Sequence, residues 1–361
     1  MVSHMKYYVD KKYDFFELFN PNNGTLIRSN IMNSNLDPRM RSFPELIDVG
    51  IMGNCIAGRK GVCVKAGIDC YQMGSIYSRN NMKIEDYQWI LEQCKGKTFQ
   101  VALGGAGDPN KHDSFEEILL LSKEYDIVPN LTTSGLQITD NEIRAIKKHC
   151  GAVAVSYYSR LKDGIESNYE TIEAIERLVR AGCITNVHYV VSADTINEAI
   201  YRLEKDRWPY GINAVIFLLY KPVGLGTIEK TLECNDKVKE FLDIATNGKH
   251  SYRIGFDTCF TSGLCNTASI DMKSIDACEA ARFSMYIDCE LNAFPCSFGI
   301  EKKQYKVKLN PKTIQDAWDS AEFEAFRNNT RLECGGCKNE MLCAGGCNLN
   351  LGIELCDNLN T

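Results

Sequence analysis

Short apolar runs alternate with longer segments of helical spacing between residues 44 and 220. Six runs have the length and the content of β-branched residues that are typical of strands: Leu46–Met52, Thr98–Leu103, Ile127–Leu131, Ala152–Ser156, Thr185–Val191 and Ala214–Tyr220. Five segments between them place apolar residues on one helical face: Lys83–Gln93, Ser114–Glu124, Asp140–His149, Tyr169–Ala181 and Ile196–Glu204. Strands that alternate with helices predict a parallel sheet with right-handed crossovers.

The number of these units bounds the fold class. A complete barrel of parallel strands needs about eight strand–helix units, and the sequence predicts six. The expected fold is therefore α/β, either a partial (β/α)6 barrel of TIM-like type or a doubly wound sheet. In both architectures ligands bind beyond the carboxyl ends of the strands, so we expect the chemistry at that end.

The two flanks of this region differ from it in pattern. Tyr13–Leu18 and Thr25–Ile31 surround a turn-rich stretch, Asn20–Gly24, which predicts a hairpin. After about residue 232 the periodicity weakens and cysteines accumulate. We therefore predict a hairpin-like appendage over residues 1–43, a barrel domain over 44–231 and a cysteine-rich domain over 232–361.

Composition excludes several classes of function. The 361 residues carry 41 Lys and Arg against 47 Asp and Glu, a net charge of −6, which disfavours a general nucleic-acid binder. No apolar run reaches the ~18 residues that cross a bilayer. The polar start, Met1–Tyr8, lacks the apolar region of a secretion signal. We therefore expect a cytoplasmic protein that binds neither nucleic acid nor membrane.

Cysteine is the unusual component, with 17 residues. An odd count in a chain without a secretion signal argues against a disulfide framework, because reducing compartments keep thiols reduced. Ten of the 17 lie between residues 259 and 356. A segment with so little apolar periodicity needs another source of cohesion, and metal clusters supply it.

The densest cysteine motif is C-x2-C-x5-C-x3-C, formed by Cys334, Cys337, Cys343 and Cys347. A C-x2-C pair directs two sulfurs at one metal from a tight turn, and glycines between the cysteines permit that turn. Spacing alone leaves a structural zinc ribbon open as an alternative to an iron–sulfur site.

The upstream cysteines extend this motif into a recognisable arrangement. Cys278 and Cys296 bracket a predicted hairpin, Phe283–Pro295, and Cys356 follows the four-cysteine motif. The set resembles the SPASM domain of radical S-adenosylmethionine (SAM) enzymes, although Leu291 stands where that pattern has glycine. The resemblance implies two auxiliary 4Fe–4S clusters, with Cys259 or Cys265 as the further upstream ligand. It assigns one cluster to Cys259, Cys278, Cys296 and Cys347, and the other to Cys334, Cys337, Cys343 and Cys356.

The first barrel strand then leads into the expected SAM-binding cluster. Cys55 follows this strand, Cys63 and Cys70 come next, and Tyr71 lies directly after them. Their spacing, C-x7-C-x6-C, is wider than the usual C-x3-C-x2-C of the family. Glycines in the loop allow it to fold back and bring the sulfurs together. Three thiolates leave one iron of a third 4Fe–4S cluster open for SAM.

Other turns at the same end of the strands are candidates for SAM contact. Gly104, Gly105, Ala106 and Gly107 resemble the glycine-rich SAM motif of the family. The remaining candidates follow or lie in later strands: Thr133, Ser134, Ser156, His188, Pro222 and Gly224. For His188 a buried structural histidine is the simpler interpretation.

The resemblance implies an activity. Radical SAM enzymes cleave SAM reductively to a 5′-deoxyadenosyl radical, which abstracts hydrogen from an unactivated C–H bond. SPASM-bearing members mostly modify peptides, so we expect crosslinking or epimerisation of a ribosomally synthesised precursor peptide, with a reductant such as ferredoxin or flavodoxin. Two alternatives remain: radical modification of a small molecule, such as dehydrogenation, and a non-catalytic zinc- or cluster-binding protein.

Epimerisation adds one requirement, a thiol that returns a hydrogen atom to the substrate. Cys183 and Cys234 are the candidates among the cysteines outside the proposed ligand sets. Buried structural thiols are the simpler interpretation of both.

Overall fold

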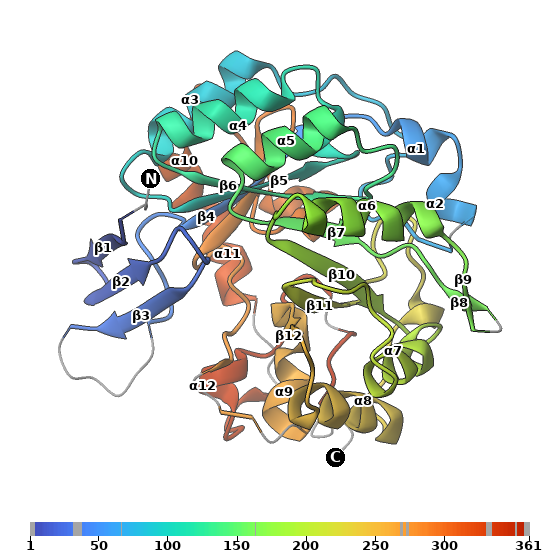
Figure 1. The fold of residues 1–361 in the computed structure, drawn as a ribbon. Coiled ribbons are helices and arrows are strands. Elements are labelled where there is room, and N and C mark those ends of the chain that lie inside the picture. The colour runs from blue at the N-terminus through green and yellow to red at the C-terminus, as the bar shows by residue number, and fades with distance from the viewer. Residues whose placement is uncertain are drawn as a thin grey trace.

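A ten-stranded sheet organises the described part of the chain, in the order β12-β11-β10-β7-β6-β5-β4-β13-β14-β15. The computed structural model describes residues 4–31, 38–65, 67–162, 164–267, 270–271, 274–329, 334–350 and 352–356. Figure 1 shows the sheet curving through the molecule, with helices along its outer side and a small separate sheet at the N-terminal end.

The six predicted barrel strands are confirmed. They are β4 (Leu46–Met52), β5 (Gln100–Gly105), β6 (Val128–Thr133), β7 (Val153–Ser156), β10 (Thr185–Val191) and β11 (Ala214–Leu219). Each pairs in parallel with the next along the chain. The sequential order of parallel strands is that of an open barrel, so it decides against the doubly wound sheet.

The crossover helices are also confirmed. They are α3 (Ile84–Cys94), α4 (Phe115–Glu124), α5 (Asp140–His149), α6 (Tyr169–Arg180) and α7 (Ile196–Glu204), with α8 (Asp236–Asn247) after the last predicted strand. Their starts follow local chemistry. Thr139 forms a capping box with Glu142 at α5, and the Asn168 side chain accepts from two backbone N–H groups at α6.

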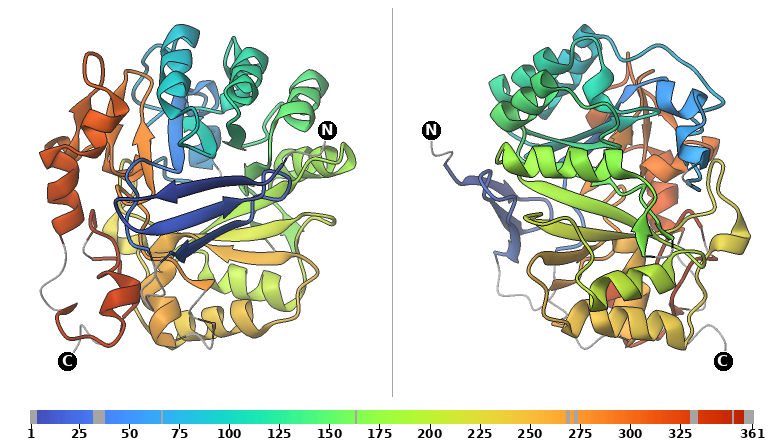
Figure 2. Two further views of the ribbon diagram at one scale, coloured as in Figure 1. Left: turned by 90° about the vertical axis from the view of Figure 1, so that its left-hand side faces the viewer. Right: turned by 45° about the vertical axis from the view of Figure 1, so that its right-hand side comes forward.

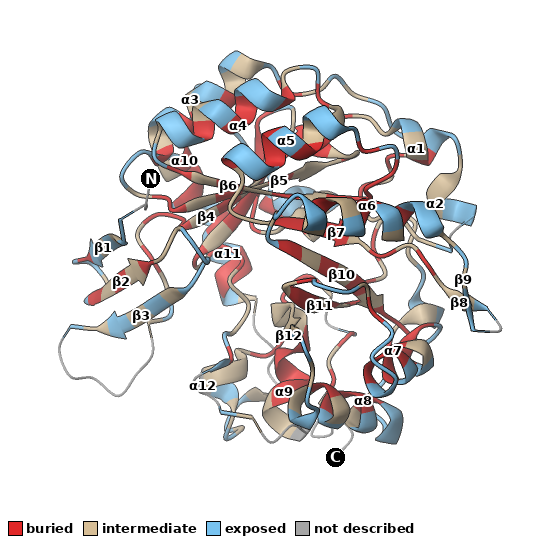
Figure 3. Cartoon of the chain, in the orientation of Figure 1, coloured by how far each residue is buried: buried red, intermediate tan, exposed pale blue. Residues whose placement is uncertain are grey.

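Burial alternates along the strands and separates the two faces of the sheet. On β5, Val101 and Leu103 are buried in the core formed with the helices, whereas Ala102 and Gly104 are partly exposed. The same alternation places His188 of β10 on the partly exposed face. Figure 3 shows buried residues concentrated where helices meet the sheet. The concave face therefore lines an open interior.

Two parallel strands beyond the predicted six extend the sheet. β12 (Arg253–Phe256) pairs with β11, and β13 (Ser284–Ile287) pairs with β4. β14 (Asn292–Phe294) turns back on β13 as the predicted hairpin, and β15 (Val307–Lys308) follows it. The sheet thus continues through residues of the predicted third domain, and the boundary after residue 231 stays a prediction from composition.

The N-terminal appendage is a three-stranded antiparallel sheet of order β1-β2-β3. Its strands are β1 (Lys6–Asp10), β2 (Phe15–Phe19) and β3 (Leu26–Asn30). The predicted hairpin is confirmed as β2 and β3. The sequence analysis missed β1, because its apolar positions alternate toward solvent rather than toward a core.

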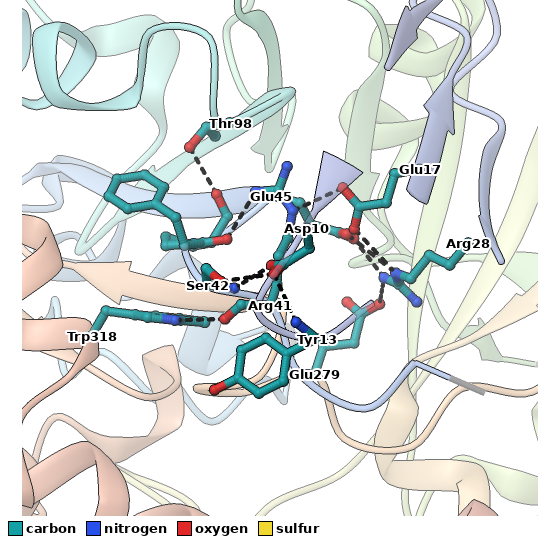
Figure 4. A network of polar contacts seen from close by, with 12 residues as sticks. Asp10, Tyr13, Glu17, Arg28, Arg41, Ser42, Glu45, Thr98, Glu279 and Trp318 are labelled. Atoms are coloured by element: carbon teal, nitrogen blue, oxygen red, sulfur yellow. Dashed lines mark hydrogen bonds and ion pairs between the residues drawn. The ribbon is translucent and has the colours of Figure 1, made fainter. Parts of the chain in front are cut away.

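A buried polar network fastens this small sheet to the barrel (Figure 4). The Glu17 carboxylate lies 2.8 Å from the Arg41 guanidinium, and both side chains are fully buried. Arg28 pairs with Glu45 at the start of the barrel and with Glu279 far along the chain. The Trp318 indole donates to the Arg41 carbonyl. Three distant segments therefore share one set of ion pairs, and Figure 2 shows the small sheet lying across the barrel strands.

The remaining elements are short. They comprise α1 (Ile56–Arg59), α2 (Val62–Lys65), α9 (Thr261–Thr267), α10 (Ile314–Trp318), α11 (Ala321–Asn328), α12 (Glu340–Cys343) and the hairpin of β8 (Leu161–Lys162) with β9 (Ile165–Glu166). Among the described residues, no helix has the length and apolar character that crossing a membrane demands.

Candidate active site

The first three candidate cysteines lie in a loop at the carboxyl end of β4. Cys55 caps the N-terminus of α1, and its sulfur accepts from the Gly58 N–H at 3.1 Å. Cys63 lies in α2, and Cys70 follows it. Left-handed backbone at Gly61 and Gly67 turns the chain between them. The wide cysteine spacing is therefore accommodated by two short helices and two glycine turns.

The charges of these three thiols interact. Burial raises the pKa of Cys55 and raises the pKa of Cys63 to about 11, and each is raised further by the charge of Cys70. A hydrogen bond from Tyr158 acts in the opposite sense on Cys63. A cation bound between neighbouring thiols favours their deprotonation. The loop therefore gathers three potential ligands at one place.

The glycine-rich turn after β5 packs directly on this loop. A Cβ on Gly107 would lie 2.3 Å from the Asn54 carbonyl oxygen, and one on Gly105 would lie 2.4 Å from the Met52 oxygen. A Cβ on Gly74 would meet the carbonyl oxygen of Ala106, which lies in the same turn, at 2.4 Å. Gly104 differs, because no atom lies within 4 Å of the position of its Cβ. The turn thus supports the cysteine loop on one side and borders open space at Gly104.

Asp108 is a site residue that the sequence analysis did not single out. Its carboxylate accepts from the Ser134 N–H at 2.7 Å and from the Ser134 hydroxyl at 2.5 Å. Burial raises the pKa of Asp108, whose charge in turn acts on Cys55 and Cys63. Its position directly after the glycine-rich turn was the available signal. Asp108 joins the turn after β5 to the turn after β6.

Thr133 and Ser134 have partners within the protein. The Thr133 hydroxyl donates to the Asn110 side chain at 2.8 Å and accepts from the Gly135 N–H. Both candidate residues are buried. Their hydroxyls therefore shape the turn, and a contact with SAM stays a prediction.

Ser156 and His188 stand side by side on the concave face, in register on β7 and β10. Ser156 hydrogen-bonds Tyr158, which reaches Cys63. Burial lowers the pKa of His188 to about 4, so its imidazole is neutral near neutral pH. A neutral histidine on this face suits a hydrogen-bonding role better than a cationic one.

The turn after β11 closes the other side of the cysteine loop. A Cβ on Gly224 would lie 2.5 Å from the Tyr71 carbonyl oxygen, and the Leu225 N–H donates to the Cys70 carbonyl at 3.2 Å. Pro222 is the partly exposed residue that opens this turn. The Tyr71 ring lies 4.5 Å from that of Phe298, which follows Cys296. The cysteine loop thus contacts turns from both ends of the strand series.

Four cysteines of the C-terminal part interact with one another: Cys259, Cys278, Cys296 and Cys347. Cys259 hydrogen-bonds Cys347, and this bond with burial holds the pKa of Cys259 well above its usual range. Burial raises the pKa of Cys278 to about 12, and the charge of Cys259 adds to it. Burial also raises the pKa of Cys296, and the charges of Cys278 and Cys259 raise it further. This is the set that the SPASM resemblance assigned to one auxiliary cluster.

A second group lies apart from the first. Cys343 interacts with Cys334 and Cys356, and burial raises its pKa to about 11. Cys265 interacts with Cys343, Cys337 and Cys356. The two upstream alternatives therefore separate: Cys259 lies with the first group and Cys265 with the second, as a fifth thiol.

The two proposed hydrogen donors occupy different ends of the barrel. Cys183 precedes β10 and interacts with Cys150, at the amino end of the strands. The structure therefore does not bring Cys183 to the cysteine loop. Cys234 lies between β11 and α8, at the end of the barrel that carries the loop.

The donor chemistry suits iron–sulfur clusters. All 17 cysteines are free thiols, and the three ligand groups that the resemblance implies stay a prediction. No three His, Cys, Asp or Glu side chains in the described ranges are already arranged around a metal position.

Comparisons with known proteins identify the architecture. None of the protein-family models matches this sequence, and neither does any curated protein. Among solved structures, Streptococcus suis SuiB bound to S-adenosylmethionine matches with a TM-score of 0.71 at 16% identity, covering 96% of this chain and 95% of that one. SuiB bound to the precursor peptide SuiA matches with a TM-score of 0.70 at 15% identity, over 95% and 94%.

A second protein supports the same result. Native anSMEcpe with bound AdoMet and the Kp18Cys peptide matches with a TM-score of 0.57 at 18% identity, covering 84% of this chain and 89% of that one. At these identities the likeness establishes a shared fold. The expected α/β partial barrel, with its cysteine-rich C-terminal part, is confirmed.

Proposed function

We propose that this chain is a radical SAM enzyme that modifies a ribosomally synthesised peptide, by forming a crosslink or by epimerisation. The observation that carries the proposal is that Cys55, Cys63 and Cys70 lie in one loop at the carboxyl end of the barrel strands, close enough for their charges to interact. The turns after β5 and β11 pack around this loop. When bound, a 4Fe–4S cluster and SAM supply a 5′-deoxyadenosyl radical.

The residues of the chain hold and shield this centre. Cys55, Cys63 and Cys70 would ligate the SAM-binding cluster, and the N–H of Gly58 already points at the Cys55 sulfur. Asp108 fixes two of the surrounding turns to each other. A reactive radical also requires that bulk water be excluded from this centre.

A peptide substrate is favoured by the open side of the barrel and by the fold it shares with SuiB. SuiB binds the precursor peptide SuiA, and anSMEcpe binds AdoMet with a peptide. β12 is an edge strand of the sheet. Because the barrel is not closed at this edge, an extended chain could enter without unfolding of the barrel. Small-molecule modification remains the alternative outcome of the tests below.

Two auxiliary clusters are part of the proposal. The first would be held by Cys259, Cys278, Cys296 and Cys347, and the second by Cys334, Cys337, Cys343 and Cys356. The buried Lys221 ammonium interacts with Cys259 and Cys296 and pairs with Asp257 at 2.6 Å. A fixed cation beside thiolate ligands favours the reduced state of a cluster, so the first site suits electron transfer. The electron donor would be a ferredoxin or flavodoxin.

Anaerobic reconstitution followed by SAM turnover tests the proposal. Reduced protein should produce 5′-deoxyadenosine, and iron and sulfide analysis should give about twelve of each per chain, four for each proposed cluster. Bound zinc without sulfide would contradict the proposal and indicate a non-catalytic zinc protein. Mass spectrometry of peptides encoded beside the gene then separates the reactions. A loss of two hydrogens indicates a crosslink, and deuterium uptake from D2O at unchanged connectivity indicates epimerisation.

A further inference from the structure

Asp48 is an ionisable residue on the concave face that takes no part in the ligand groups or ion pairs described above. β4 alternates buried Ile47 and Val49 with residues that face the interior, and Asp48 is one of these. In the described part of the chain no hydrogen bond or ion pair reaches its carboxylate. Its register neighbours are Tyr286 of β13 on one side and Ala102 of β5 on the other.

The neighbours of Asp48 provide no positive charge. The charged and titratable groups that face it are Glu279, Tyr71 and Cys296, from three different segments. Burial raises the pKa of Asp48 to about 7, and the Glu279 charge raises it further. A buried carboxylate without a cation is unfavourable, and such groups are usually paired.

Space for a partner exists on the same face. Ala102 is the register neighbour of Asp48 on β5, and a small side chain there leaves room over the strand. Gly104 lies two positions further on, with nothing within 4 Å of its Cβ position. Tyr71, which interacts with Asp48, directly follows the proposed cluster ligand Cys70. Asp48 therefore lies between the proposed SAM-binding loop and Cys296 of the first auxiliary group.

A cavity that Glu279 also lines lies beside β12. It has a volume of about 650 Å³, and β12 is the last strand of the sheet at this side. Its described lining includes Asp257, Asp276 and Glu279 and contains no lysine or arginine. Glu279 belongs both to this cavity and to the surroundings of Asp48. These three carboxylates are already paired, Asp257 with Lys221 and both Asp276 and Glu279 with Arg28, so they leave no free charge for a ligand, unlike Asp48.

We propose that Asp48 binds a cationic side chain of the peptide substrate, a lysine or an arginine, inside the barrel. The inference rests on the proposed function, because it takes the barrel interior to be the substrate chamber. It adds a specificity determinant: the carboxylate pairs with the ammonium or guanidinium group and fixes which residue of the peptide lies next to the SAM-binding loop. An apolar side chain of the same length would leave the carboxylate unpaired.

Binding of defined peptides tests this assignment. The probes are blocked pentapeptides, Ac-Ala-Ala-Xaa-Ala-Ala-NH2, with lysine, arginine or norleucine at Xaa. Their affinities for the anaerobically reconstituted, SAM-bound protein are measured by saturation-transfer NMR at neutral pH. We expect the two cationic peptides to bind about tenfold more tightly than the norleucine peptide, the effect of one ion pair. Asp48→Asn should remove the preference, and Asp48→Glu should retain it.

A matched variant controls for net charge. Asp126 is an exposed carboxylate at the opposite end of the barrel strands, so Asp126→Asn removes one negative charge and should leave the preference intact. Equal binding of the three peptides, binding of none, or a cation preference that survives in Asp48→Asn contradicts the assignment. SAM cleavage by the wild-type protein separates the two proposals. Cleavage without a cation preference refutes the role of Asp48 alone, and absence of cleavage refutes the proposed function.

Discussion

The Glu17 carboxylate and the Arg41 guanidinium meet at 2.8 Å with both side chains completely excluded from solvent. Arg41 also donates to the Phe43 carbonyl at 2.8 Å. This ion pair joins the second strand of the small N-terminal sheet to the segment that enters the barrel. Removing one member leaves a buried charge without its partner, which is more costly than the net contribution of the pair itself.

Arg41→Leu should therefore destabilise the protein by about 3–5 kcal/mol. Chemical denaturation measured by circular dichroism gives the free energy of unfolding. The control is Lys12→Ala, which breaks an exposed contact of 4.0 Å between Lys12 and Asp319 and should have little effect. A double variant, Glu17→Leu with Arg41→Leu, should recover part of the loss. Equal effects of Arg41→Leu and Lys12→Ala would contradict the buried-pair argument.

Substitution of Cys55, Cys63 and Cys70 together by alanine should abolish 5′-deoxyadenosine formation, because the proposed SAM-binding cluster loses its ligands. Liquid chromatography of the reduced, SAM-supplied protein measures the product. Cys289→Ala removes a half-buried thiol outside the three groups and should leave product formation intact. Continued SAM cleavage by the triple variant would place the cluster elsewhere in the chain.

Cys259 and Cys265 should behave differently although they are close in sequence. Cys259 interacts with Cys347, Cys278 and Cys296, so Cys259→Ser should change the electron paramagnetic resonance signal of the proposed first auxiliary cluster. Cys265→Ser should leave that signal unchanged, because Cys265 interacts with Cys337, Cys343 and Cys356 instead. The reverse pattern would exchange the two assignments.

The stability of the protein should depend on pH through Asp48. Its pKa is raised to about 7 in the folded chain, against about 3.9 in an unfolded one. Ionised Asp48 therefore disfavours folding, and stability falls as the pH rises from about 4 to about 7. Asp48→Asn removes this penalty, up to about 4 kcal/mol, above pH 7 and not below pH 4. Thermal unfolding should show a gain in Tm at about pH 8 that shrinks at about pH 5. A loss of Tm at both would indicate a structural hydrogen bond instead.

Gly224 should tolerate no side chain. Its φ of +63° is left-handed, and a Cβ there would lie 2.5 Å from the Tyr71 carbonyl oxygen. Gly224→Ala should displace the cysteine loop and lower SAM affinity more than about tenfold, as measured by calorimetry. Gly164→Ala is the matched control. Gly164 has a φ of +78° but open space around its Cβ position, so the backbone strain is similar without the collision. Equal losses in both variants would contradict the packing argument.

The sequence predicted the barrel because its strands are apolar runs whose burial is decided locally. Strands such as Leu46–Met52 and Thr185–Val191 have observed bounds identical to the predicted ones. β12 was missed, because Arg253–Phe256 is only four residues long and lacks a fully buried position. The parallel pairing of β13 with β4 joins residues far apart in the chain, and no local pattern predicts such a partner.

In the candidate site, too, the sequence predicted features that depend on residue type and missed those that depend on three-dimensional neighbours. The resemblance to the SPASM domain implied the ligand groups, which stay a prediction. It left Cys259 and Cys265 as alternatives, since only their three-dimensional neighbours distinguish them. Asp48 went unnoticed inside an apolar run, where one carboxylate barely changes the periodicity. Cys183 lies just before the amino end of β10, opposite the end that carries the cysteine loop. The sequence could not show this separation, because it depends on how the strands are arranged in the sheet.

The parallel contact between β4 and β13 has a consequence for how the chain is made. β4 ends at Met52, and its neighbour on that side, β13, begins at Ser284. During synthesis on the ribosome, the edge of β4 that pairs with β13 therefore stays unpaired until most of the polypeptide has emerged. An edge left open for that time is prone to pair with other nascent chains. Yield during expression should accordingly be sensitive to truncation before residue 284, even where every residue of the six-stranded core is retained.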